Sequence, residues 1–63
     1  MVMKQYRVMI VDDHPLMRRG IKQLLGLDAR FGVVAEAGNG SEAVALALQH
    51  APDVILLDLN IDR

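Results

Sequence analysis

The hydrophobic residues of this chain fall into two patterns, short continuous runs and stretches with helical spacing. The continuous runs are Val8–Val11 and Val54–Leu57, and a third apolar stretch covers Val33–Ala37. Short runs rich in branched residues are typical of strands that are buried on both faces of a parallel sheet. We therefore predict strands over Tyr6–Val11, Val33–Ala37 and Val54–Leu57.

The stretch after the first run has the spacing of an amphipathic helix. Pro15 suits the first helical position, where its missing N–H costs nothing, and the pattern ends near Gly26. Glycine inside a helix costs about 1 kcal/mol relative to alanine, so Gly20 suggests that the helix approaches the sheet closely. The apolar stripe that we expect in the core consists of Met17, Gly20, Ile21, Leu24 and Leu25.

A second helix follows the turn Gly38-Asn39-Gly40. Asn39 with Glu42 three residues later has the pattern of a capping box, and Pro52 ends the helix. The turn lacks both the third glycine of a dinucleotide-binding loop and the lysine of a P-loop, which favours a structural role. The apolar positions expected on this helix are Ala43, Val44, Ala47, Leu48 and Ala51.

The element order strand, helix, strand, helix, strand predicts an α/β fold with a parallel sheet and right-handed crossovers. With 63 residues the chain is long enough for one small domain at most, and a domain of that size is marginally stable. Its composition is 52% hydrophobic and it has no cysteine that could add a disulfide. We interpret the chain as an incomplete domain whose apolar surface is covered by further material.

The charge balance argues against several kinds of partner. The net charge is −1 and no basic run or stripe is present, so neither nucleic acid nor an anionic membrane is expected to bind directly. No apolar segment has the length of a signal peptide or of a membrane span. The absence of cysteine fits a reducing compartment. We expect a cytoplasmic protein.

Carboxylates stand directly after two of the predicted strands. Asp12 and Asp13 follow the first strand and Asp58 follows the third. If these strands are neighbours, each pair of acids at about 5 Å repels by roughly 3 kcal/mol at an effective dielectric of about 20. Such a cluster is expected to hold a divalent metal or a proton. The simpler alternatives are a turn at Asp12 and Asp13 and a helix cap or solvated loop acid at Asp58.

The two histidines are predicted to be surface residues. His14 follows the paired acids at the start of the first helix, and His50 ends the second helix. A hard cation such as Mg2+ prefers oxygen ligands, so we expect His14 to lie at the surface rather than to bind metal.

Four separate stretches together resemble a known family. They are Ile10-Val11-Asp12-Asp13-His14-Pro15-Leu16, then Arg18 with Gly20, then Glu36-Ala37-Gly38-Asn39-Gly40, and finally Leu56-Leu57-Asp58-Leu59-Asn60. From Tyr6 to Asn60 the chain resembles the amino-terminal half of a bacterial response-regulator receiver domain. It is most similar to the NarL/FixJ group, whose receivers precede a LuxR-type helix-turn-helix. The resemblance implies a truncated flavodoxin-like (CheY-like) sheet with strand order 2-1-3.

The resemblance also implies roles for individual residues. Asp58 matches the aspartate that accepts a phosphoryl group from a histidine kinase, and the protein would not be an enzyme. Asp12, Asp13 and Asp58 match the Mg2+ ligands, together with the backbone carbonyl of Asn60. Residues 1–63 would form a partial receiver, with three strands and two helices. The other half of the receiver and the DNA-binding output domain are absent from this sequence, and DNA would be bound only through that output domain.

Two departures limit these implications. The chain has Ile61-Asp62-Arg63 where many receivers have a Met-Pro-Gly-like loop. The family also places Ser or Thr after a fourth strand and Lys after a fifth, and the 63 residues supply neither strand. We therefore expect weak Mg2+ binding and little phosphoryl uptake by this chain.

Two further hypotheses follow from the same residues. A phosphohydrolase with an aspartate nucleophile is the alternative function, suggested by Asp58 and Asn60 beside a metal site. Such enzymes usually carry the nucleophile after the first strand and a second aspartate two residues later, which this chain does not match. The other hypothesis is an inactive, self-associating half domain. The edge Val54–Leu57 would then be covered in a homodimer or by exchange of elements between chains.

Overall fold

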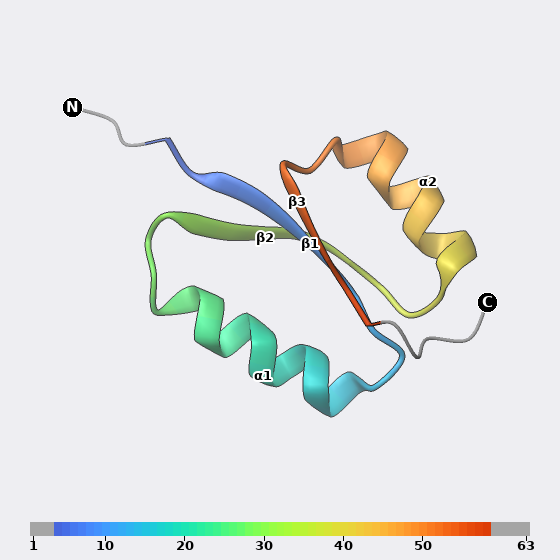
Figure 1. Cartoon of the computed structure of the whole chain (residues 1–63), viewed down its shortest axis with the longest axis horizontal. Helices are drawn as coiled ribbons and strands as arrows, with labels where there is room; N and C mark the ends of the chain where they lie inside the picture. The colour runs from blue at the N-terminus through green and yellow to red at the C-terminus, as the bar shows by residue number, and fades with distance from the viewer. Residues whose placement is uncertain (1–3, 59–63) are drawn as a thin grey trace.

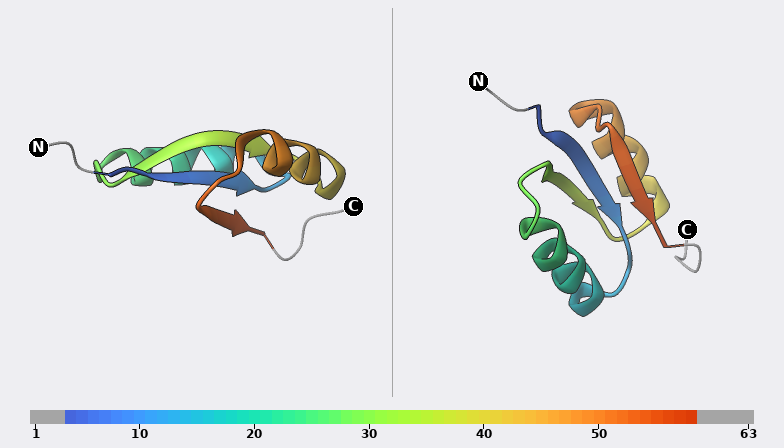
Figure 2. Two further views of the ribbon diagram at one scale, coloured as in Figure 1. Left: turned by 90° about the horizontal axis from the view of Figure 1, so that it is seen from above. Right: turned by 60° about the vertical axis from the view of Figure 1, so that its left-hand side comes forward.

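The computed structural model describes residues 4–58, which form a twisted parallel sheet with one helix on each face (Figure 1). In chain order the elements are β1 (Tyr6–Val11), α1 (Pro15–Gly26), β2 (Phe31–Ala37), α2 (Gly40–His50) and β3 (Val54–Leu57). The strand order is β2-β1-β3 and both pairings are parallel, as predicted. Figure 2 shows this sheet from two further directions.

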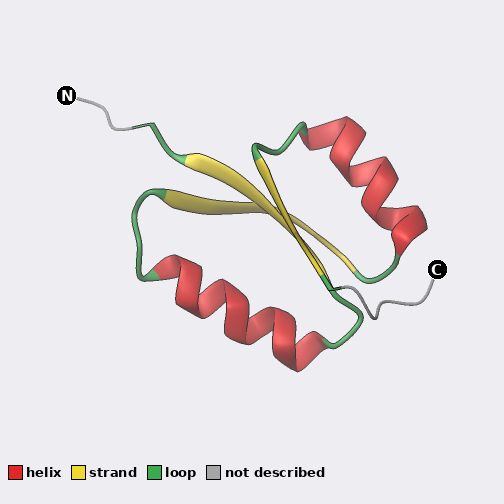
Figure 3. Cartoon of the chain, in the orientation of Figure 1, coloured by secondary structure: helices red, strands yellow, loops and turns green. Residues whose placement is uncertain are grey.

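The central strand β1 carries the core. Val8–Val11 is almost completely buried because β1 is paired along both edges and covered on both faces. On the α2 side, Met9 and Val11 form a cluster with Ala37 of β2. Figure 3 shows the strands lying between the two helices. The partly buried residues that pack against this cluster are Ala35, Ala43, Leu46 and Ala47. The prediction of a strand buried on both faces is therefore confirmed for β1.

The first helix has the predicted position, but fewer of its apolar side chains are buried than the sequence suggested. Ile21 and Leu25 are partly buried, whereas Met17 is 58% and Leu24 is 69% exposed, so the prediction that the whole stripe lies in the core was wrong. The predicted close approach at Gly20 was also wrong, because a Cβ atom there would have no atom within 4 Å. The physical reason is that α1 packs against β2, and nothing in the described part of the chain covers its remaining apolar side.

The second strand begins two residues earlier than predicted, at Phe31. The preceding turn explains the difference, because Tyr6 N donates to Arg30 O at 2.7 Å and so begins the pairing with β1 there. Arg30 also binds Asp28, with Nη2 at 2.6 Å from Oδ2. This side-chain hydrogen bond lowers the pKa of Asp28 from 3.8 to about 2.

The second helix begins with half of the predicted capping box. Asn39 Oδ1 accepts a hydrogen bond from Glu42 N at 2.8 Å, as expected of an N-cap. Glu42 Oε1 accepts from Gly38 N at 2.7 Å instead of from the N-cap residue. Of the apolar positions expected on this helix, Val44 and Leu48 are exposed, because the face of α2 that meets the sheet carries Ala43, Leu46 and Ala47.

The third strand lies at the edge of the sheet and is more exposed than predicted. Its four residues are between 36% and 56% exposed, so the expectation of burial on both faces was wrong for this strand. Within residues 4–58 only β1 pairs with β3, which leaves the outer edge of β3 open. No helix in this range is both long and apolar enough to cross a membrane.

The open edge of β3 leads us to expect self-association of the chain. An exposed apolar strand edge is a template for pairing with another chain. Light scattering after size exclusion should give the mass of two chains for the wild type, and Ile55→Lys should shift the mass toward that of one chain. Leu27→Lys is the matched control, because Leu27 is exposed but lies outside β3. A wild-type chain that stays monomeric at high concentration would contradict this expectation.

Candidate functional site

The acids after β1 and β3 meet at the carboxyl edge of the sheet. Two backbone hydrogen bonds extend the ladder past the strand ends, from Asp12 N to Ala37 O at 3.0 Å and from Asp58 N to Val11 O at 2.9 Å. These bonds join Asp12 to the end of β2 and Asp58 to the end of β1, so the two acids lie on adjacent strand extensions. One ligand atom from each of Asp12, Asp13, His14 and Asp58 lies within 4.8 Å of the others. The predicted meeting of the three acids is confirmed.

The three carboxylates differ in their access to solvent. The Asp12 side chain is only 5% exposed, Asp58 is 22% exposed and Asp13 is 32% exposed. Asp12 Oδ1 accepts a hydrogen bond from His14 N at 2.8 Å, which ties the buried carboxylate to the start of α1. The cluster therefore has a fixed buried acid at its base and two more accessible acids around it.

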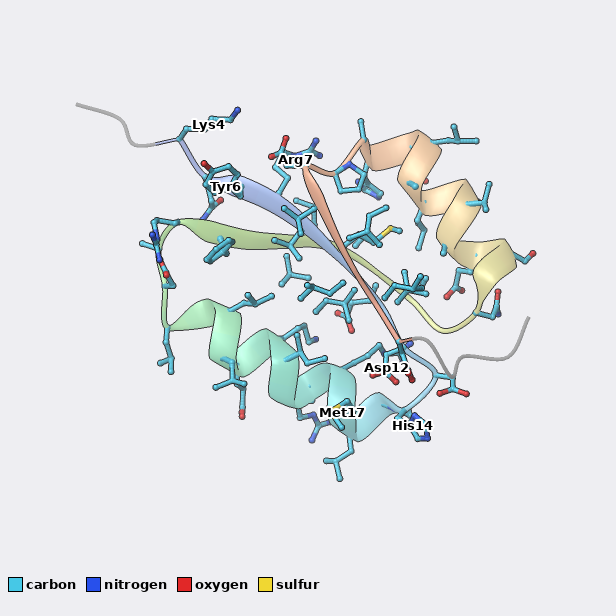
Figure 4. The ribbon with its side chains drawn as sticks, in the orientation of Figure 1. Lys4, Tyr6, Arg7, Asp12, His14 and Met17 are labelled. Carbon is cyan, nitrogen blue, oxygen red and sulfur yellow. The ribbon has the colours of Figure 1, made fainter. Side chains whose placement is uncertain are left out.

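His14 lies over this cluster, which the sequence analysis did not foresee. Its side chain is 69% exposed, so the prediction of a surface residue is confirmed. The ring nevertheless lies beside the acids, with Nδ1 at 2.8 Å from Asp13 Oδ1 and 3.3 Å from Asp12 Oδ1. Figure 4 shows Asp12 where β1 ends and His14 at the beginning of α1. Its position directly after the acid pair was the signal that could have revealed this placement.

Arg18 connects α1 to the backbone of the site. Its Nη1 donates to the carbonyl oxygen of Asp12 at 3.0 Å, and its Nε lies 3.7 Å from Glu36 Oε1 of β2. Lys22 Nζ lies 2.9 Å from the other oxygen of Glu36. Glu36 therefore attracts two of the three cationic residues of α1, and Arg18 holds the backbone of Asp12 rather than its carboxylate.

The site opens into a groove between α1 and β3. The groove has a volume of about 480 Å³. Its polar lining comes from Asp12, His14 and Asp58, and its apolar lining is Ile10, Val11, Met17, Ile21, Leu56 and Leu57. The carboxylates can therefore be reached by a small ion or a phosphoryl group from this side.

The donor set fits a hard divalent cation. Carboxylate oxygens are the ligands that Mg2+ prefers, and a bound cation would relieve the repulsion among Asp12, Asp13 and Asp58. The cationic side chain of Arg18 is directed to a carbonyl oxygen and to Glu36. The carbonyl of Asn60, predicted as a further ligand, lies outside the described residues.

Comparison with known proteins identifies the family. The response regulator receiver domain family matches residues 8–63. The chain is 64% identical over 56 residues to the nitrate/nitrite response regulator protein NarP of Escherichia coli (strain K12), which covers 89% of this chain and 26% of that protein. It is 46% identical over 54 residues to the nitrate/nitrite response regulator protein NarL of the same strain, which covers 86% of this chain and 25% of that protein.

A solved structure agrees with this assignment. The two-component response regulator of the LuxR family from Aurantimonas sp. SI85-9A1 superposes with a TM-score of 0.88 at 37% sequence identity. The match covers 94% of this chain and 42% of that one. The chain thus spans about a quarter of the length of the curated relatives described above. The predicted resemblance is confirmed, and the chain belongs to the response regulator receiver domain family, with relatives of the NarL and NarP type.

Proposed function

We propose that Asp58 accepts a phosphoryl group from a histidine kinase, with Mg2+ held by Asp12, Asp13 and Asp58. The observation that carries this proposal is the meeting of carboxylates from two strand ends in one accessible cluster. The family match also supports this proposal, because receivers take part in two-component signalling. A histidine kinase is therefore the partner that we expect for this site.

The chemistry needs little more than positioning and charge. An oxygen of the Asp58 carboxylate attacks phosphorus, the bond between phosphorus and the kinase imidazole nitrogen breaks, and an aspartyl phosphate forms while the imidazole takes up a proton. The cation, when bound, neutralises charge on the phosphoryl oxygens. Asp12 and Asp13 orient that cation, and the buried position of Asp12 fixes its place relative to Asp58.

The regulatory role in this proposal would belong to a longer protein. The relatives NarP and NarL are named as nitrate/nitrite response regulators, and this chain matches only about a quarter of each. We propose that the receiver controls transcription through a DNA-binding domain elsewhere in that protein, in the cytoplasm. In this proposal the full-length protein is a phosphorylated switch and not an enzyme, whereas this chain by itself is an inactive half domain.

The alternative, an aspartate-nucleophile phosphohydrolase, predicts a different outcome. A receiver takes up one phosphoryl group from a donor and becomes phosphorylated itself, whereas a hydrolase releases phosphate into solution continuously. The candidate nucleophile here follows β3, and the matching relatives NarP and NarL are regulators. These observations favour the receiver. Steady release of phosphate from a small phosphoester by the full-length protein would reverse this ranking.

Phosphoryl uptake by the chain should be small, dependent on Mg2+ and confined to Asp58. We expect it to be small because residues 4–58 contain no strand beyond β3 that could carry the hydroxyl and lysine used by the family. Incubation with a small phosphoramidate, followed by intact-mass and peptide mass spectrometry, measures the label. Asp58→Asn should remove it. Asp28→Asn, which changes an acid in the turn before β2, should leave it unchanged.

Three results would contradict this expectation. Label that persists in Asp58→Asn would place the acceptor at another residue. Absence of label on every acid, with Mg2+ present and the chain folded, would remove the proposed acceptor role. High uptake at Asp58 would keep the acceptor but refute the expected weakness.

If the Asp58 carboxylate serves chemistry and not the fold, replacing it should not destabilise the chain. Asp58→Asn removes one charge from a repelling cluster and keeps the backbone hydrogen bond to Val11, so the free energy of unfolding should stay the same or rise by up to about 1 kcal/mol. The same change at Asp28 removes an attraction to Arg30 and should not stabilise. Urea denaturation measures both variants. A loss of more than about 2 kcal/mol in Asp58→Asn would show that the carboxylate supports the fold.

A further inference from the structure

Arg18 holds the peptide group that joins two of the acids at the strand ends. Its Nη1 donates to the carbonyl oxygen of Asp12 at 3.0 Å, and this carbonyl belongs to the planar peptide unit between Asp12 and Asp13. The other backbone polar group of Asp12, its N–H, donates to Ala37 O at 3.0 Å. The bond to Arg18 therefore restricts the rotation of the peptide that sets how the Asp12 and Asp13 side chains are oriented relative to each other.

Residues of β2 and of the loop after it surround the guanidinium of Arg18. Its Nε lies 3.7 Å from Glu36 Oε1, and the other oxygen of Glu36 lies 2.9 Å from Lys22 Nζ. At Gly38 a Cβ atom would lie 3.2 Å from Arg18 Nη1, so the missing side chain leaves room for the guanidinium. The Arg18 side chain is only 23% exposed. Arginine suits this place because its rigid fork of donors can bind two acceptors at once.

The direction of these contacts separates Arg18 from an ordinary neighbouring charge. A cationic side chain beside an acidic cluster repels a metal ion, so its charge alone would weaken metal binding. The hydrogen bond to the Asp12 carbonyl has the opposite effect, because ligands that are already held in place bind an ion more tightly. The two effects differ in sign, so the affinity of a variant without the guanidinium shows which one dominates.

We propose that Arg18 is a positioning residue for the cation site and that it raises the affinity of the site through the Asp12 carbonyl. This inference rests on the proposed function, because the ion concerned is the one held by Asp12, Asp13 and Asp58. Within residues 4–58, the side-chain hydrogen bonds and salt bridges of Arg18 end on that carbonyl and on Glu36. Arg18 therefore acts on the ion only through the backbone that carries its ligands.

Titration with Mn2+, which takes oxygen ligands as Mg2+ does, tests the inference. The electron paramagnetic resonance signal of free Mn2+ gives the dissociation constant. Arg18→Met should weaken Mn2+ binding by about tenfold, as is typical when a residue that holds a metal ligand is removed. Arg18→Lys should keep part of the affinity, because an ammonium group can reach the carbonyl but lacks the fork that also binds Glu36.

Arg19→Met is the matched control. Arg19 is the next residue of α1 and is exposed, and within residues 4–58 its side chain makes no hydrogen bond or salt bridge. The control removes the same charge by the same substitution, and it should change Mn2+ affinity by less than about twofold.

A second measurement needs no metal. In NMR spectra of the metal-free chain, the carbonyl carbon of Asp12 and the amide of Asp13 report the hydrogen bond, because they belong to one peptide unit. Arg18→Met should shift both signals, and Arg19→Met should leave both in place. Circular dichroism establishes that each variant is folded. If Arg18→Met does not fold, Arg18→Lys decides: weaker Mn2+ binding with shifted signals supports positioning, and wild-type affinity overturns it.

Asp58→Asn separates failure of this inference from failure of the proposed function. If Asp58→Asn weakens Mn2+ binding while Arg18→Met leaves it unchanged or strengthens it, the cation site stands and Arg18 is only a neighbouring charge. Equal losses in Arg18→Met and Arg19→Met would also overturn the positioning role. If Asp58→Asn leaves Mn2+ binding unchanged, or if the wild-type chain does not bind Mn2+, the proposed cation site is wrong and the inference fails with it.

Discussion

The parallel pairing of β1 along both edges is the constraint on which the rest of the structure depends. It buries Val8–Val11 at the centre of the sheet, and it brings the ends of β1 and β3 to one edge. Because the ladder continues to Asp12 and Asp58, the two acids stay adjacent despite their repulsion. The hydrogen-bonded backbone thus imposes a concentration of negative charge that the side chains alone would avoid. A cation is the natural partner of such an arrangement.

Two cationic side chains of α1 bind groups next to the three carboxylates rather than the carboxylates themselves. Arg18 reaches the carbonyl of Asp12, and Lys22 binds Glu36, so neither side chain fills the space among the three carboxylates. His14 alone among the basic residues in described salt bridges reaches the cluster itself. The arginine and the histidine near the site therefore have different roles. Arginine fixes the backbone that carries the site, and the imidazole shares the space in which an ion would bind.

The sequence predicted best where a local rule decides the structure. Continuous apolar runs located the strands, and Asn39 with Glu42 located the start of α2. Burial of Met17 and Leu24 was mispredicted because helical periodicity shows which side is apolar but not what lies opposite it. The acid cluster was predictable from strand ends alone. The ring position of His14 was missed, because the orientation of the ring depends on backbone geometry set jointly by Asp12 and Pro15.

We expect Asp12, Asp13 and Asp58 to act together as one cation site. The most direct test is a Mg2+ titration of the wild-type chain followed by NMR at the side-chain carboxyl carbons of all aspartates. We expect the three signals to shift together with a single dissociation constant, while the signal of Asp28, bound to Arg30 in the turn before β2, stays in place. Three separate titrations, or shifts no larger than that of Asp28, would contradict the claim.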